Sequence, residues 1–149
     1  MSGRISLAVI LALACTSALA LDGKAIYDAN CASCHQPDGA GAVGLAPPLL
    51  GTLGKRVSLP AGRRYVAGVL IAGLAGKLES KGVVYNGIMP NWQQFSDDEL
   101  AGVANHILTT FNGPELAAGF QPYVATEFTE MRAKKASGKV LRAWRSESE

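Results

Sequence analysis

The run Cys31-Ala32-Ser33-Cys34-His35 constrains this chain more than any other stretch of its sequence. Two cysteines three positions apart, with a histidine directly after the second, are typical of covalent attachment of a c-type haem. The two thiols can bond to the two vinyl groups on one edge of a porphyrin, and the following imidazole then lies beneath the ring. The pattern therefore predicts that Cys31 and Cys34 attach one haem c and that His35 is an axial ligand of its iron.

Two other interpretations of this motif have to be weighed. A zinc site needs about four ligands of cysteine, histidine or carboxylate type, and the only other cysteine and histidine in the chain are Cys15 and His106. A redox-active dithiol of the thioredoxin type needs a βαβ context, which the flanking sequence lacks. Both alternatives are therefore disfavoured relative to covalent haem.

The first twenty residues differ in character from the rest of the chain. Arg4 gives a basic start, residues 5–14 are apolar, and Ala18-Leu19-Ala20 is a small-residue cleavage signal. This pattern predicts a secretory signal peptide over residues 1–20, and hence a periplasmic protein. The apolar run is short for a transmembrane helix, so we expect no membrane span after cleavage. A lipid anchor at Cys15 is the alternative.

The charges of the chain are nearly balanced, with 14 basic and 12 acidic residues. The overall charge therefore favours neither a nucleic-acid partner nor a membrane surface, and we expect no nucleic acid to bind. The end of the chain is more basic, with Arg132, Lys134, Lys135, Lys139, Arg142 and Arg145 against Glu147 and Glu149.

Apolar periodicity and capping residues predict four helical segments, at residues 22–30, 60–73, 96–110 and 125–144, the last with a break near Gly138. Ser96 and Glu99 form a capping box at the start of the third segment. A small β-hairpin is expected over residues 77–85, since β-branched residues follow a turn near residues 80–82. The final helical segment has two interpretations that we weigh equally, a cover for the flank of the domain or a docking arm for a partner protein.

Residues 36–51 are expected to form a loop, because glycines and prolines recur throughout. A histidine that binds haem iron usually donates its second ring N–H to a backbone carbonyl. Pro47 is the candidate acceptor in this loop. Leu45, Leu49 and Leu50 are expected to cover the edge of the cofactor.

Met89 is the second informative position. The sequence places it in a predicted loop between Gly87 and Pro90, whereas a core methionine normally sits in a periodic element. A thioether sulfur is a good sixth ligand for haem iron, and a His/Met pair raises the reduction potential. The prediction is therefore His35 and Met89 as the two iron ligands. The alternative is a second imidazole from His106, although its position within a helix favours a packing or surface role.

These motifs, in this order, resemble those of the class I (monohaem) cytochromes c over roughly residues 22–111. The resemblance rests on an aromatic-bearing helix that leads into Cys31–His35, followed by Ala46-Pro47-Pro48-Leu49, Gly87-Ile88-Met89-Pro90 and Phe95-Ser96-Asp97-Asp98-Glu99. It implies an all-α fold around one haem, with the first and last core helices crossing.

The resemblance also implies roles for individual residues. Gly23 and Tyr27 would pack against Val103 and His106 where the two helices cross. Leu49 would pack on the haem ring, and Trp92 would lie near a propionate.

A looser resemblance concerns the hairpin and the region after Gly113, which are similar to parts of haem subunits that accept electrons from periplasmic dehydrogenases. The expected organisation is a signal peptide (1–20), a haem domain (21–112) and a C-terminal extension (113–149).

The function implied is a non-enzymatic carrier of single electrons between a dehydrogenase and an acceptor such as a terminal oxidase or another cytochrome. One alternative is a haem subunit fixed in a dehydrogenase complex. The other is a haem sensor or peroxidase whose Met89 bond yields to a small ligand, although the sequence offers no distal acid–base pair.

Overall fold

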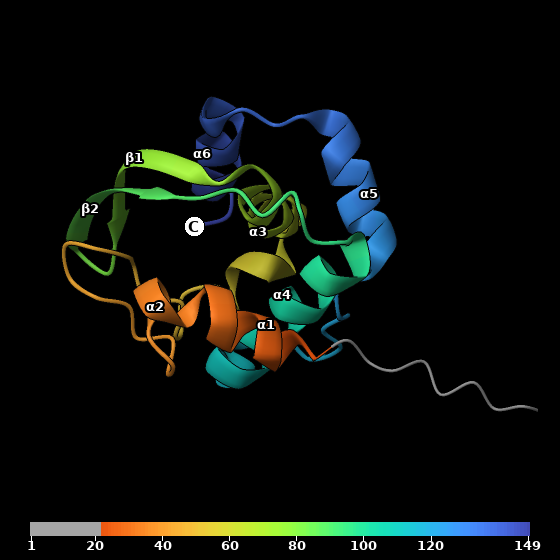
Figure 1. Ribbon diagram of the computed structural model, residues 1–149, viewed down its shortest axis with the longest axis horizontal. Coiled ribbons are helices and arrows are strands. Elements are labelled where there is room, and N and C mark those ends of the chain that lie inside the picture. Colours follow the sequence, from red (N-terminus) through yellow and green to blue (C-terminus); the bar gives the residue numbers. More distant parts are fainter. Residues whose placement is uncertain (1–21) are drawn as a thin grey trace, which may run out of the picture.

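The computed structural model describes residues 22–149 (Figure 1). The predicted signal peptide and the lipid-anchor alternative at Cys15 lie outside these residues. Within them the chain forms, in order, α1 (Gly23–Asn30), α2 (Ala32–His35), the 3₁₀ turn η1 (Arg56–Ser58), α3 (Pro60–Ala72), β1 (Leu74–Ser80), β2 (Val83–Met89), α4 (Asp97–Phe111), the 3₁₀ turn η2 (Gly113–Glu115), α5 (Ala125–Lys134) and α6 (Gly138–Ser146). The predicted all-α fold with a small hairpin is confirmed.

Helix α1 packs against α4 through a very close approach at Gly23. A Cβ atom built on Gly23 would lie 2.1 Å from the carbonyl oxygen of Gly102 in α4. One turn further along α1, the fully buried ring of Tyr27 lies 5.5 Å from the imidazole of His106, measured between ring centroids. The packing predicted for these two helices is therefore present, and His106 takes part in it.

The start of α4 has the capping box that the sequence predicts. The backbone N–H of Glu99 donates to Ser96 Oγ at 3.3 Å, and the backbone N–H of Ser96 donates to Glu99 Oε2 at 2.7 Å. The helix ends at Phe111, one residue beyond the predicted end.

The hairpin is longer than predicted, and Met89 is its last residue rather than part of a loop. The antiparallel register pairs Leu74 with Met89 at the open end of the ribbon. Gly73 ends α3 with a φ of 69°, and Gly76 lies within β1. The loop prediction was wrong because strand pairing is made by backbone hydrogen bonds. Glycines, which suggested a loop, have the same backbone groups as other residues and can take part in this pairing.

The C-terminal extension is part of the core. Helices α5 and α6 lie against α3 (Figure 1), and Phe128, Met131 and Leu141 are buried in the same apolar cluster as the residues of α3 and α4. Of the two interpretations weighed for this segment, a cover for the flank is therefore the one that the structure supports. The break between the two helices falls at Lys135, which has a φ of 46°, and Gly138 begins α6.

No helix within residues 22–149 combines the length and the apolar character needed to cross a membrane.

Candidate functional site

The cysteine–histidine motif lies at the junction of α1 and α2. Cys31 ends α1, and α2 is a single turn that carries Cys34 and His35. Neither thiol forms a disulfide within the described residues. Burial and the neighbouring Cys34 raise the pKa of the Cys31 thiol to about 11, so it stays protonated at neutral pH. Two unpaired thiols thus flank one turn of helix, with the imidazole directly after them.

The imidazole of His35 is held in one orientation by the loop that follows. Its Nδ1 atom lies 2.9 Å from the carbonyl oxygen of Pro47, the acceptor that the sequence predicts. A carbonyl oxygen can only accept, so Nδ1 carries the proton and Nε2 keeps its lone pair. Burial lowers the pKa of His35 and outweighs the opposing effect of this hydrogen bond. The imidazole is therefore neutral, as a metal ligand must be.

The turn after His35 is fixed by the first helix. The hydroxyl of Tyr27 donates to the carbonyl oxygen of Gln36 at 2.6 Å. Gln36 itself has a φ of 66°, a conformation that side-chain-bearing residues rarely adopt. This contact positions the chain as it leaves α2 and starts the loop towards Pro47.

A cavity of about 590 Å³ opens between this loop, the tip of the hairpin and the end of α6. Such a volume is within the range of about 300–1,000 Å³ that is usual for cofactor sites. Pro47 and Leu49 are among its lining residues, together with Arg56, Tyr65 and Arg145. The lining thus mixes apolar side chains with charged ones, including two guanidinium groups that could pair with carboxylates. The cavity adjoins the loop that holds His35, and the fit to a covalently bound haem rests on the two free thiols and the neutral imidazole.

Of the predicted site residues, Pro47 and Leu49 line this cavity, whereas Cys31, Cys34, His35, Met89 and Trp92 do not. Met89 and Trp92 are half-buried and pack against the core cluster. The backbone N–H of Trp92 donates to the carbonyl oxygen of Leu70 at 3.1 Å, which joins the segment after β2 to α3. The structure thus joins His35 to Pro47, and it places Met89 at the end of the hairpin.

Asn112, which directly follows α4 and is not among the predicted site residues, supports the loop over the cavity. Its Oδ1 atom accepts from the backbone N–H groups of Thr52, Leu53 and Gly54 at 3.0, 2.8 and 3.2 Å. The side chain is fully buried. An asparagine at a helix end is usually a local cap, so no sequence signal distinguishes this long-range role. Arg56, which lines the cavity, is also not among the predicted site residues.

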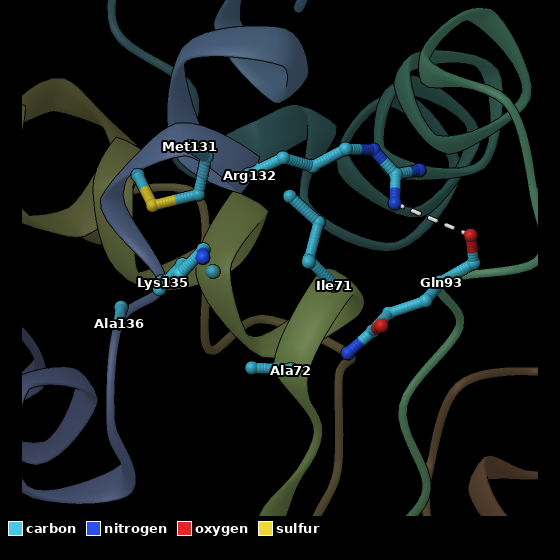
Figure 2. A pocket seen from close by; sticks show the side chains of 8 residues that line it. Ile71, Ala72, Gln93, Met131, Arg132, Lys135 and Ala136 are labelled. Carbon is cyan, nitrogen blue, oxygen red and sulfur yellow. Dashed lines mark hydrogen bonds between the residues drawn. The ribbon is translucent and has the colours of Figure 1, made fainter.

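A second cavity, of about 420 Å³, lies between α3 and α5 (Figure 2) and includes none of the predicted site residues. The guanidinium of Arg132 points across it and donates to the backbone carbonyl of Gln93 at 3.2 Å. The same guanidinium donates to the carbonyl of Phe95 at 2.6 Å and pairs with Asp97. This cavity is therefore separate from the cysteine–histidine motif.

Residues 20–111 match the family model described as cytochrome c. The chain belongs to the cytochrome c family and is an electron-carrying c-type cytochrome with one covalent haem c and its iron. It is similar to cytochrome c-552 of Thermus thermophilus, at 44% identity over 114 residues, which is 76% of this chain and 86% of the relative. A second cytochrome c-552, from a particular strain of Thermus thermophilus, is also 44% identical over 114 residues, with 76% of each chain covered.

Proposed function

We propose that this cytochrome carries single electrons in the periplasm, with Cys31 and Cys34 as the haem attachment points and His35 and Met89 as the axial ligands. The observation that carries the proposal is the hydrogen bond of 2.9 Å from His35 to Pro47 beside two unpaired thiols. It leaves Nε2 as the free lone pair of a neutral imidazole. A bound haem would supply the redox chemistry, and with His35 and Met89 both holding the iron no position would remain for a substrate.

Two apolar side chains complete the proposed site. Leu49 packs on the haem ring, which its place in the lining of the large cavity supports. Trp92 lies near a propionate; the support for this is the family resemblance, together with its half-buried position beside Phe95, whose ring centroid is 5.8 Å away.

We infer that redox partners meet the protein at an apolar patch formed by Val43, Leu45 and Ile88, which are 84%, 54% and 82% exposed. The first two belong to the loop after the haem motif and the third to β2. Loop and strand meet here, because a Cβ on Gly87 would lie 3.2 Å from the Leu45 carbonyl oxygen. Electron-transfer partners usually meet through small contacts of less than about 1,200 Å². A patch of this kind suits such brief encounters.

The donor we propose is a periplasmic dehydrogenase, and the acceptor is a terminal oxidase or another cytochrome. The sequence pattern of residues 1–20 supports the periplasmic location. The support for the donor is the looser resemblance of the hairpin and the extension to haem subunits of such enzymes.

The ligand assignment is tested by replacing each described methionine with leucine. Met89→Leu removes the proposed sulfur ligand, so the oxidised protein is expected to lose its long-wavelength sulfur-to-iron absorption band and to have a lower reduction potential. Met131→Leu is the control, because Met131 is a buried core residue whose volume leucine preserves. Retention of the band in Met89→Leu would contradict the assignment.

A further inference from the structure

The hairpin that carries Met89 has little support of its own. Within the described part of the chain it is a two-stranded ribbon in which β1 pairs only with β2. Such ribbons are marginal in water, and their outer edges expose unpaired backbone groups. Because Leu74 pairs with Met89, any shift of β1 also moves the end of the hairpin that holds the proposed ligand. The position of Met89 therefore depends on what holds the outer edge of β1.

Helix α6 holds that edge through two arginines one turn apart. Arg142 donates through Nη2 to the carbonyl oxygen of Ala75, and Arg145 donates through Nη2 to that of Glu79 at 2.6 Å. Ala75 directly follows Leu74, the strand partner of Met89. Ala75 and Glu79 are four residues apart, so their carbonyls point to the same side of the strand. The two contacts therefore secure β1 at its base and near its tip.

Helix α6 can act as a support because it is itself anchored to the core. Leu141, which directly precedes Arg142, is fully buried. Arg56 donates to the carbonyl oxygen of Arg145 and, at 2.8 Å, to Ser148 Oγ. Arg145 is also paired with Glu149 at 2.6 Å. The guanidinium groups that reach β1 thus come from a fixed helix.

We propose that Arg142 and Arg145 are positioning residues that keep Met89 on the haem iron. This inference rests on the proposed ligation by Met89. The charged donors hold β1 in place, and the strand register passes this restraint to Met89. When both donors are removed, the end of the hairpin moves more freely, the sulfur leaves the iron more often, and external ligands compete for the vacated position.

The test compares two double variants of the full-length, haem-bearing protein that each remove two positive charges. Arg142→Gln/Arg145→Gln removes the contacts to β1. Lys134→Gln/Lys139→Gln is the matched control, because both lysines are exposed residues of the extension, and neither side chain makes a hydrogen bond or ion pair within residues 22–149. Imidazole is titrated into the oxidised protein while the sulfur-to-iron band is recorded.

We expect the arginine variant to bind imidazole about tenfold more tightly than the parent, which corresponds to about 1.4 kcal/mol, and the lysine variant to bind within about twofold of the parent. Should the double arginine variant yield no haem-bearing protein, Arg142→Gln and Arg145→Gln are titrated singly, and an unchanged affinity in both overturns the proposal. Far-ultraviolet circular dichroism and the melting temperature verify that each variant is folded at the temperature of titration.

The outcomes separate this inference from the proposed function. A parent that shows the band, with an arginine variant that keeps both the band and the parent's imidazole affinity, overturns the positioning role and leaves Met89 as the ligand. A parent that lacks the band overturns the ligation and the positioning role together. An increase in affinity that is as large in the lysine variant also overturns the positioning role, since general loss of charge then explains it.

Discussion

The backbone of α1 comes as close to α4 as it does because Gly23 has no side chain. A Cβ at this position would lie 2.1 Å from the carbonyl oxygen of Gly102 and 2.9 Å from the backbone nitrogen of Val103. Backbone atoms cannot turn aside as a flexible side chain can, so the two helices would have to separate. Since α1 leads directly into Cys31, the same separation would disturb the haem motif.

Gly23→Ala is therefore expected to lower the free energy of unfolding by about 1–3 kcal/mol or more, as overpacking usually does. Gly113→Ala is the control, because a Cβ at Gly113 meets nothing within 4 Å, and its effect is expected to stay within about 0.5 kcal/mol. Guanidinium unfolding of both proteins, followed by far-ultraviolet circular dichroism, gives the two values. Equal stabilities would contradict the close approach of the two helices.

Between elements, α4 and α5 are joined by an ion pair at the start of α4. Arg132 Nε lies 2.6 Å from Asp97 Oδ1, and the hydroxyl of Thr129 donates to Asp97 Oδ2 at 2.5 Å. Burial raises the pKa of Asp97, but the hydrogen bonds from Arg132 and Thr129 and the charge of Arg132 outweigh it, so the pKa is lowered in the folded protein. Asp97 also lies in the first turn of α4, where a negative charge favours the helix dipole.

A carboxyl whose pKa is lowered by folding stabilises the protein above its unfolded pKa of about 3.9, and this contribution disappears as the pH falls through the folded value. Asp97→Asn is therefore expected to cost about 1–2 kcal/mol at pH 7. The difference from the parent should shrink below about pH 4. Asp98→Asn, at an exposed position in the same helical turn, is the control and should cost less at pH 7. Urea unfolding over a series of pH values measures both, and a difference that does not change with pH would disprove the role of this pair.

At the scale of the whole molecule, the C-terminal extension and the haem domain share one core. Leu141 of α6 is fully buried, and one of its methyl carbons would lie 2.5 Å from a Cβ built on Gly68 of α3. Phe128 of α5 is equally buried beside Tyr123, with ring centroids 5.7 Å apart. A segment packed in this way is expected to unfold together with the rest of the chain.

Leu141→Ala should accordingly lower the free energy of unfolding by about 2–5 kcal/mol. The transitions followed by haem absorption and by circular dichroism should still coincide, as they do in two-state unfolding. Val140→Ala, at the neighbouring position that is 37% exposed, should cost less than about 1 kcal/mol. If circular dichroism reported unfolding of the extension before the haem signal changed, the extension would be a separate unit.

The sequence by itself determined the features that depend on short spacings. Cys31, Cys34 and His35 lie within about one helical turn of one another, and so do Ser96 and Glu99 of the capping box. Family resemblance predicted the packing partners of α1, and loop chemistry predicted the carbonyl of Pro47 as the acceptor for His35. The distances agree with both predictions. Local geometry permits few arrangements of such residues, and the pattern therefore predicts them well.

Only the tertiary structure decided which distant segments touch. Arg142 and Ala75 are 67 positions apart, and Asn112 and Thr52 are 60 apart. No local periodicity relates such pairs. The same holds for Met89, because a strand is defined by its partner's backbone and not by its own side chains alone. The sequence of the extension was equally compatible with a docking arm and with a cover for the flank of the domain. The extension is part of the core because Phe128 and Leu141 pack against the apolar face of α3.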